Sequence, residues 1–460
     1  MTQGATLRLA GLIEATRIDD APAEAVRIAR DLFFDTVGVA LAGAAEPGSR
    51  LVRGYAEAAG AGALTILGSA QTASAHFAAT CNGTAAAILD YDDSTWRCIG
   101  HPSGVVVPAV LTLGEELGAS GRAVLDAYMI GHETIGKIAR GTVPALYLRG
   151  RHTTGALGVF GAAAACARLL GLDADRTAVA LGIAASCSGA VRAAHGSMTK
   201  GLHSGMAAAN GIMAARLAAG GFTARDDALE HIHGFVRSAL VESEYDLDAI
   251  GRGWADPWDF LEPDEGPGIK LIPSGTTSFC AGECAMEIHR RDRPEPAEIE
   301  AIEWRTTPLS LDIARYGAPK DRNQAFYSVP WVIAVGLIDG RTGLAQFDDA
   351  RLADPEPLKL CEKVVMSLHP DLENTGDPSQ SVAGELVVRL RDGRELRHTR
   401  LRPRAYPRGE PWTRAQLEEK YREAALRSLP EPQVEQAIAV LDRLDELSDI
   451  GELMRTLRPA

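Results

Sequence analysis

The segment Asp90-Tyr-Asp-Asp-Ser places three carboxylates within four residues, and Gly100-His-Pro-Ser-Gly follows it closely. Asp90, Asp92 and Asp93 come at the end of a predicted helix, where like charges repel one another and the helix dipole disfavours them. A cation or a ligand would relieve that repulsion, and His101 can exchange a proton near neutral pH. An ordinary acidic loop, or a helix cap formed by one of these aspartates, is the alternative and stays open.

Two further motifs begin helices rich in glycine and alanine. Arg151 and His152 precede two threonines whose hydroxyls could bind a carboxylate at a helix N-terminus; a helix cap with an incidental histidine is the alternative. Lys200 and His203 are three residues apart and therefore share one helical face. A cation at a helix N-terminus is unfavourable for the helix unless an anion binds there. This motif therefore predicts an anion site.

A fourth position is Lys270, which lies at the seam between two predicted domains. Together the four positions supply two histidines, two lysines and a group of carboxylates. Lysine and histidine can anchor substrate carboxylates, and an imidazole can move a proton on the carbon beside one. Such a transfer needs neither a metal nor an organic cofactor, so we expect none.

Motifs for other chemistries are missing from the sequence. No dinucleotide-binding or phosphate-binding glycine loop follows a strand pattern, and no Gly-x-Ser-x-Gly motif occurs. Cys280 and Cys284 lack a second pair of zinc ligands, and His231 with His233 is a lone pair. The three aspartates lack the glycine and glutamate that complete a calcium loop.

The composition narrows the classes of partner. The chain has 460 residues and a formal net charge of −14, which argues against nucleic acid or an anionic membrane as a partner. Its N-terminal segment has Arg8 and Glu14 where a signal peptide would be apolar, and no stretch is apolar enough to span a bilayer. Seven scattered cysteines suit a reducing compartment. We therefore expect a soluble cytoplasmic protein.

The elements that would position these residues fall into three regions. Residues 1–266 have apolar positions three and four apart, which predicts helices and argues against a doubly wound sheet. Residues 267–403 mix strand and helix patterns and predict a smaller α/β domain. Residues 404–460 are helical again and should pack on the first region. The predicted helices span 23–43, 74–90, 105–118, 121–140, 154–170, 175–189, 203–220, 323–339, 413–428 and 431–447; the predicted strands span 298–306, 363–367, 386–390 and 395–401, the last two joined by an Asp-Gly turn.

In the order and spacing of these motifs the chain resembles the MmgE/PrpD family, whose known members include 2-methylcitrate dehydratase, cis-aconitate decarboxylase and iminodisuccinate epimerase. The resemblance runs from Asp35-Thr-Val-Gly to Pro407-Arg-Gly-Glu-Pro. It implies a mostly helical fold, in which a large all-helical domain carries an inserted α/β lid domain, and a homodimer. Its most specific segments are Asp90-Tyr-Asp-Asp-Ser, His101-Pro-Ser-Gly, His152-Thr-Thr-Gly, Gly171-Leu-Asp, Lys200-Gly-Leu-His-Ser-Gly and Phe326-Tyr-Ser-Val-Pro-Trp.

The resemblance also implies an active site. The two histidines would transfer protons, the lysines would hold substrate carboxylates, and one aspartate would position or polarise a neighbour. The implied catalytic residues are Asp93, His101, His152, Lys200 and Lys270, and the further substrate contacts are Asp92, His203 and Arg151.

The sequence departs from the family pattern near the seam. Family members often have an aromatic residue at the position of Arg151, and a Tyr, a Cys and a His where this chain has Ile272, Gly275 and Phe279. These changes predict a substrate that differs from methylcitrate in size or polarity, and Arg151 could bind an extra carboxylate. The His-Pro-Ser-Gly form of the second motif is closer to the decarboxylases than to the dehydratase.

Three functions fit these observations. The first is a cofactor-independent lyase that dehydrates or decarboxylates a small di- or tricarboxylate by proton transfer beside a carboxylate. The second is an epimerase of an iminodiacid, which would use the same proton transfer without a leaving group. The third is a non-catalytic protein that binds a polycarboxylate. Each has a small anion as its partner.

Overall fold

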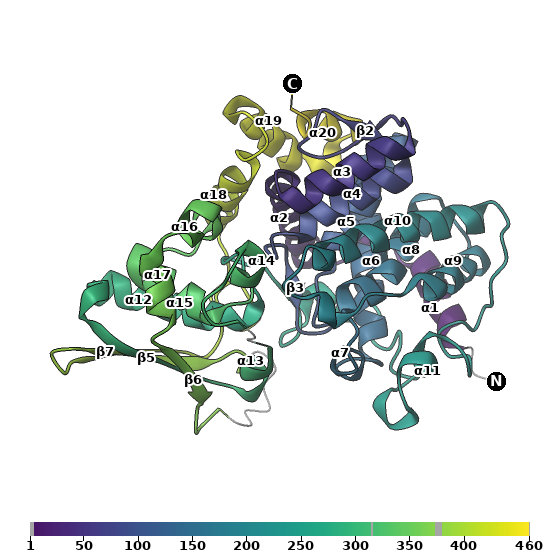
Figure 1. Cartoon of the computed structure of the whole chain (residues 1–460). Helices are drawn as coiled ribbons and strands as arrows, with labels where there is room; N and C mark the ends of the chain where they lie inside the picture. The colour runs from purple at the N-terminus through teal and green to yellow at the C-terminus, as the bar shows by residue number, and fades with distance from the viewer. Residues whose placement is uncertain (1–3, 314–315, 373–379, 460) are drawn as a thin grey trace.

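The computed structural model describes residues 4–313, 316–372 and 380–459. Helices make up most of these residues, and they form a large helical lobe and a smaller lobe that meet along one side (Figure 1). The helices of the large lobe are α1 (Ala5–Ala15), α2 (Ala23–Ala44), α3 (Pro47–Ala59), α4 (Ala75–Ala87), α5 (Ser103–Leu117), α6 (Gly121–Ala139), α7 (Ala145–Leu148), α8 (Thr153–Leu169), α9 (Ala174–Cys187), α10 (Thr199–Ala219), α11 (Phe235–Ala239), α18 (Arg414–Ala425), α19 (Glu431–Asp442) and α20 (Gly451–Thr456).

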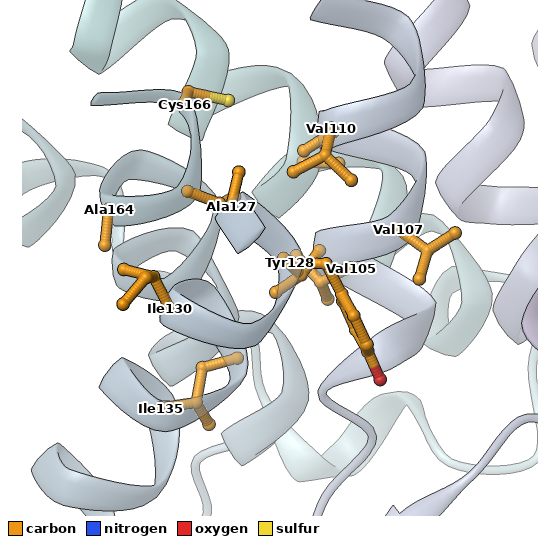
Figure 2. Packing of buried hydrophobic residues seen from close by; sticks show 14 of the residues in the cluster. Val105, Val107, Val110, Ala127, Tyr128, Ile130, Ile135, Ala164 and Cys166 are labelled. Carbon is orange, nitrogen blue, oxygen red and sulfur yellow. The ribbon is translucent and has the colours of Figure 1, made fainter. Parts of the chain in front are cut away.

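Small side chains allow the helices of the large lobe to pack closely. Helix α10 lies against α4 and α8, and α8 also contacts α6. A methyl group added at Gly83 on α4 would come within 2.8 Å of the Gly205 backbone on α10, so these axes approach more closely than larger residues allow. Valines of α5, Tyr128 of α6 and Cys166 of α8 belong to the buried apolar core of this lobe (Figure 2). The glycine and alanine content of these segments therefore reflects packing.

The smaller lobe contains a four-stranded sheet in the order β6-β5-β7-β8. Strand β5 pairs parallel with β6 and antiparallel with β7, and β7 forms the expected hairpin with β8. Helices α12 and α15 pack against one another beside it. Its elements are α12 (Phe279–Asp292), β5 (Ile299–Thr306), α13 (Pro308–Ile313), α14 (Arg322–Ala325), α15 (Val329–Asp339), α16 (Asp349–Leu352), α17 (Pro355–Cys361), β6 (Val364–Leu368), β7 (Gly384–Leu390) and β8 (Glu395–Arg400).

The prediction of one continuous helix over residues 323–339 is wrong. Residues 323–339 form two helices, because the chain leaves the helical path after Ala325 and starts again at Val329. The Ser328 side chain accepts a hydrogen bond from the Trp331 N–H and so caps the second helix. Pro330 in its first turn cannot donate the bond that a continuous helix would need.

The chain returns to the large lobe through its C-terminal helices. Helix α18 packs on α2, and Lys420 of α18 forms a buried ion pair with Asp35 of α2 at 2.7 Å. Its ammonium also donates to the Tyr91 carbonyl at 2.9 Å.

Two short pairings, β1 (Leu64–Thr65) with β2 (Thr72–Ala73) and β3 (Ser94–Thr95) with β4 (Pro267–Gly268), complete the fold. All seven cysteines are free, and within the described residues no helix has the length and apolar character to cross a membrane.

Candidate active site

The predicted histidines and lysines gather at a cavity of about 390 Å³ between the two lobes. His101 lies just before α5, His152 just before α8, Lys200 in the first turn of α10, and Lys270 just after β4. All four line the cavity and are at least nine-tenths buried. The structure therefore brings together four of the five residues implied as catalytic.

The carboxylate at the centre of this group is Asp90. Its Oδ1 accepts hydrogen bonds from Lys200 Nζ at 3.1 Å and from Lys270 Nζ, and His101 Nε2 lies 3.4 Å away. Burial alone would raise the pKa of Asp90, but the two lysines and His101 hold it well below its usual range. The residue has a φ of +49°, in a region that aspartate tolerates better than most residues. This conformation turns the chain shortly after the end of α4. Asp90 therefore neutralises part of a cationic site.

The environment of His101 determines which nitrogen can take part in proton transfer. Its Nδ1 lies 2.8 Å from the Asp93 carbonyl, which can only accept, so Nδ1 carries a proton. Nε2 is then the nitrogen that gains and loses a proton on the Asp90 side. Burial and the two lysines lower the pKa of His101 well below its usual value, while Asp90 opposes them. These surroundings therefore favour neutral His101.

Asp92 and Asp93 follow Asp90 closely in the chain, but they are not among the lining residues of the cavity. Asp93 accepts hydrogen bonds from the Ser103 hydroxyl at 2.8 Å and from its N–H at 3.3 Å. Burial, together with Asp92, raises the pKa of Asp93 to about 8. Burial raises the pKa of Asp92 to about 6, and its carboxylate lies 3.5 Å from His101 Nδ1. Asp93 thus holds the loop and the ring of His101, whereas both carboxylate oxygens of Asp92 are buried without a hydrogen-bond partner among the described residues. Asp90, which is not among the residues that the resemblance implies, lines the cavity.

The threonines after His152 have a different role from the one predicted. Thr154 Oγ1 accepts from the His101 N–H at 3.1 Å, and Thr153 donates to the Ile99 carbonyl at 2.6 Å. They therefore hold the loop that carries His101, and these two bonds go to the backbone. Arg151 is half-buried, and the cavity lining does not include it; its backbone forms an isolated bridge with Val191.

His203 lies behind His152. The Nδ1 atoms of the two rings are 3.0 Å apart, so one ring donates to the other, and His203 is not among the lining residues. Burial and Lys200 lower the pKa of His152 well below its usual value, and burial lowers that of His203. The shared helical face predicted for Lys200 and His203 is real, but the second residue supports His152.

Four aromatic residues that were not predicted also line the cavity: Trp96, Tyr147, His195 and Tyr327. Tyr327 stacks on His195 with ring centroids 5.5 Å apart, and His195 meets His152 edge to face. Burial and the neighbouring Asp90 raise the pKa of Tyr327 well above its usual value, so the phenol keeps its proton. Tyr327 belongs to the motif Phe326-Tyr-Ser-Val-Pro-Trp, which could have pointed to it, whereas His195 had no such signal.

The three departures from the family pattern that follow Lys270 occupy different places. Ile272 is buried in the core of the smaller lobe. Gly275 lines the cavity and donates to the Phe326 carbonyl at 2.7 Å. Phe279 has its ring centroid 5.8 Å from Lys270 Nζ. The departures therefore lie around Lys270 and leave the lysine itself in place.

Asp90, Asp92 and His101 have one potential ligand atom each within 4.8 Å of the others, and among the described residues they are the only such group. Two lysine ammonium groups already contact the Asp90 oxygen that a metal would need. A cation at this group would have to compete with both ammonium groups for Asp90, and it is these ammonium groups that can bind an anion. A buried cavity with two ammonium donors and an imidazole can bind carboxylates and transfer a proton at an adjacent carbon.

Comparison with known proteins agrees with this geometry. The model of the MmgE/PrpD N-terminal domain matches residues 7–248, and that of the MmgE/PrpD C-terminal domain matches residues 273–446. The chain belongs to the MmgE/PrpD family. Among its relatives, the cis-aconitate decarboxylase of Mus musculus is 26% identical over 469 residues, covering 100% of this chain and 94% of the relative. The cis-aconitate decarboxylase of Homo sapiens is 28% identical over 391 residues (83% and 79%), and that of Aspergillus terreus strain NIH 2624 is 27% identical over 465 residues (95% and 93%). Family and relatives point to an MmgE/PrpD-type lyase.

Proposed function

We propose that this MmgE/PrpD protein decarboxylates a small unsaturated tricarboxylate of the cis-aconitate type, without a metal or organic cofactor. The observation that carries the proposal is the convergence of Lys200 and Lys270 on one buried carboxylate, that of Asp90, beside His101 Nε2. A substrate carboxylate can bind beside Asp90, because the Lys200 ammonium has three donors and gives one of them to Asp90. The names of the relatives favour decarboxylation over dehydration.

The proposed reaction begins when the bond to the carboxylate on the saturated carbon breaks and CO2 leaves. The electron pair of that bond moves across the double bond to the far carbon, which carries another carboxylate. That carboxylate takes up the charge as an enediolate, and a lysine ammonium stabilises it in the water-poor cavity. A proton from His101 Nε2 then bonds to the far carbon. The trianion and one proton thus become a dianion and CO2.

His101 must be protonated to act in this way. Burial and the lysines lower the pKa of His101, whereas a bound trianion would add negative charge beside the ring and raise it. Bound substrate thereby favours the protonated form of His101, which is the proton donor of the proposed reaction. His152 is the second proton donor that we propose, held by His203 through the 3.0 Å contact.

Two further expectations stay proposals. Residues from both lobes line the cavity, which supports a smaller domain, 267–403, that acts as a lid over a helical domain formed by 1–266 and 404–460. The homodimer rests on the family resemblance.

The test is incubation of the purified chain with cis-aconitate in deuterated water, with CO2 and products followed by NMR. We expect CO2 release and a five-carbon product with one new deuterium at the far carbon. His101→Asn, which keeps a donor for the Asp93 carbonyl, should abolish turnover without unfolding the protein, and His233→Asn, at an exposed loop, should not affect it. Hydration of the double bond would instead identify a dehydratase. Failure of cis-aconitate to react, with deuterium exchange into an iminodiacid, would identify an epimerase, and binding without turnover would refute an enzymatic role.

A further inference from the structure

We infer that the natural substrate carries an apolar substituent of several carbons beside its carboxylates, an inference that rests on the proposed function. The cluster of Asp90, Lys200 and Lys270 occupies one part of the cavity. Elsewhere the cavity is lined by serine and threonine hydroxyls, by aromatic rings, by a few charged side chains and by aliphatic side chains. Six of the aliphatic residues are hereafter called the aliphatic wall: Ala139, Val143, Pro144, Leu309, Ile313 and Val382.

The aliphatic wall is built from both lobes. Ala139 ends α6, and Val143 and Pro144 precede α7. Leu309 and Ile313 are four residues apart on α13, so they share one face of that helix. Helix α13 lies across from α7 where the lobes meet (Figure 1). Several elements of both lobes therefore contribute to the aliphatic wall.

A bare tricarboxylate would use this wall poorly. Each of its carboxylates needs cations or hydrogen-bond donors, which aliphatic side chains cannot supply. The cavity of about 390 Å³ falls in the range of about 300–1,000 Å³ typical of sites for drug-sized ligands, which are much larger than a six-carbon acid. The spare volume beside aliphatic groups suits an alkyl chain.

The arginines of the lining do not provide a second anion site. Arg97 pairs with Glu262 at 3.1 Å and also with Glu265, and Arg140 pairs with Glu262 at 2.6 Å. Among the described lining residues, the cationic side chains outside the Asp90 cluster are these two, and both already have carboxylate partners. An additional carboxylate on the substrate would therefore meet charges that are already balanced, whereas an alkyl group displaces only water.

Calorimetry with unreactive ligands tests this inference apart from turnover. The probes are tricarballylate, the saturated tricarboxylate, and its derivatives with a propyl group on either terminal methylene carbon. Each buried methylene is worth about 0.8 kcal/mol, or about fourfold in affinity, so we expect at least one propyl derivative to bind at least about tenfold more tightly than tricarballylate. Leu309→Ser should reduce that ratio several-fold, and Leu311→Ser, on the same helix but outside the lining, should preserve it.

The outcomes separate the two proposals. If tricarballylate binds and cis-aconitate is decarboxylated, but neither propyl derivative binds more tightly, the inference fails and the proposed function stands. If a propyl derivative binds more tightly but Leu309→Ser leaves the ratio unchanged, the aliphatic wall is not the binding surface and the inference also fails. If no tricarboxylate binds and none reacts, the proposed function fails, and the inference fails with it.

Discussion

Replacement of Asp90 by asparagine tests the electrostatic account of the site most directly. Asp90→Asn keeps the shape of the side chain but removes the negative charge that faces Lys200, Lys270 and His101. Two ammonium groups that are almost fully buried would then lack their shared counter-ion. Removing one partner of a buried ion pair costs about 3–5 kcal/mol. With an unfolding entropy of about 2.1 cal/mol/K for each of 460 residues, this loss lowers Tm by about 3–5 °C.

The same substitution changes proton transfer in a defined direction. Asp90 raises the pKa of His101 against burial and the lysines, so its loss lowers that pKa further. A carboxylate at this distance is worth about one to three pKa units, so kcat at neutral pH should fall about ten- to thousand-fold, and the decline of kcat with rising pH should move to lower pH. The KM for an anionic substrate should not rise, because the site has gained net positive charge.

The assay is a pH profile of kcat and KM for cis-aconitate decarboxylation, combined with thermal unfolding. Asp227→Asn is the matched control, because it removes a carboxylate from a solvent-exposed pair with Arg225. It should change neither measurement. An Asp90→Asn protein with unchanged Tm and with kcat within about twofold of the original at every pH would refute the reasoning.

Three further substitutions test the supporting contacts. Burial and Asp92 raise the pKa of Asp93 to about 8, so the folded protein keeps a proton that the unfolded chain loses near pH 4, and stability is lost as the pH rises from about 4 to 8. Asp93→Asn should therefore flatten Tm against pH in this range, and an unchanged slope would contradict it. His203→Ala should lower kcat, change its pH profile through His152 and leave KM nearly constant, with partial recovery in His203→Asn; an unaltered profile would exclude the positioning role. Lys420→Met leaves the buried Asp35 unpaired and should cost about 3–5 kcal/mol in chemical denaturation, part of which Lys420→Met with Asp35→Asn recovers; equal loss in both proteins would show that the pair is not what matters.

Long periodic segments made most of the helices predictable. The helix predicted over 23–43 is α2, and the Asp-Gly turn between two alternating segments gave the β7–β8 hairpin in the correct place. The break between α14 and α15 was missed because the apolar pattern continues across it, while a local serine cap and a proline decide the path of the backbone.

The site was predictable by motif but not by individual aspartate. Asp90, Asp92 and Asp93 are neighbours in sequence, and their directions depend on the positive φ at Asp90 and on the Ser103 bonds to Asp93. A residue pattern reveals neither the backbone conformation of Asp90 nor the hydrogen bonds from Ser103. His195 joins the cavity through tertiary contacts alone.

The contact of Lys420 with the Tyr91 carbonyl and Asp35 has a consequence for how the protein is made. The loop with the three aspartates leaves the ribosome early, but the lysine that supports it is synthesised 329 residues later. A nascent or truncated chain that ends before α18 therefore contains every residue of the cavity and lacks the cation beneath its acidic loop. The acidic loop should therefore reach its final position only when synthesis is almost complete.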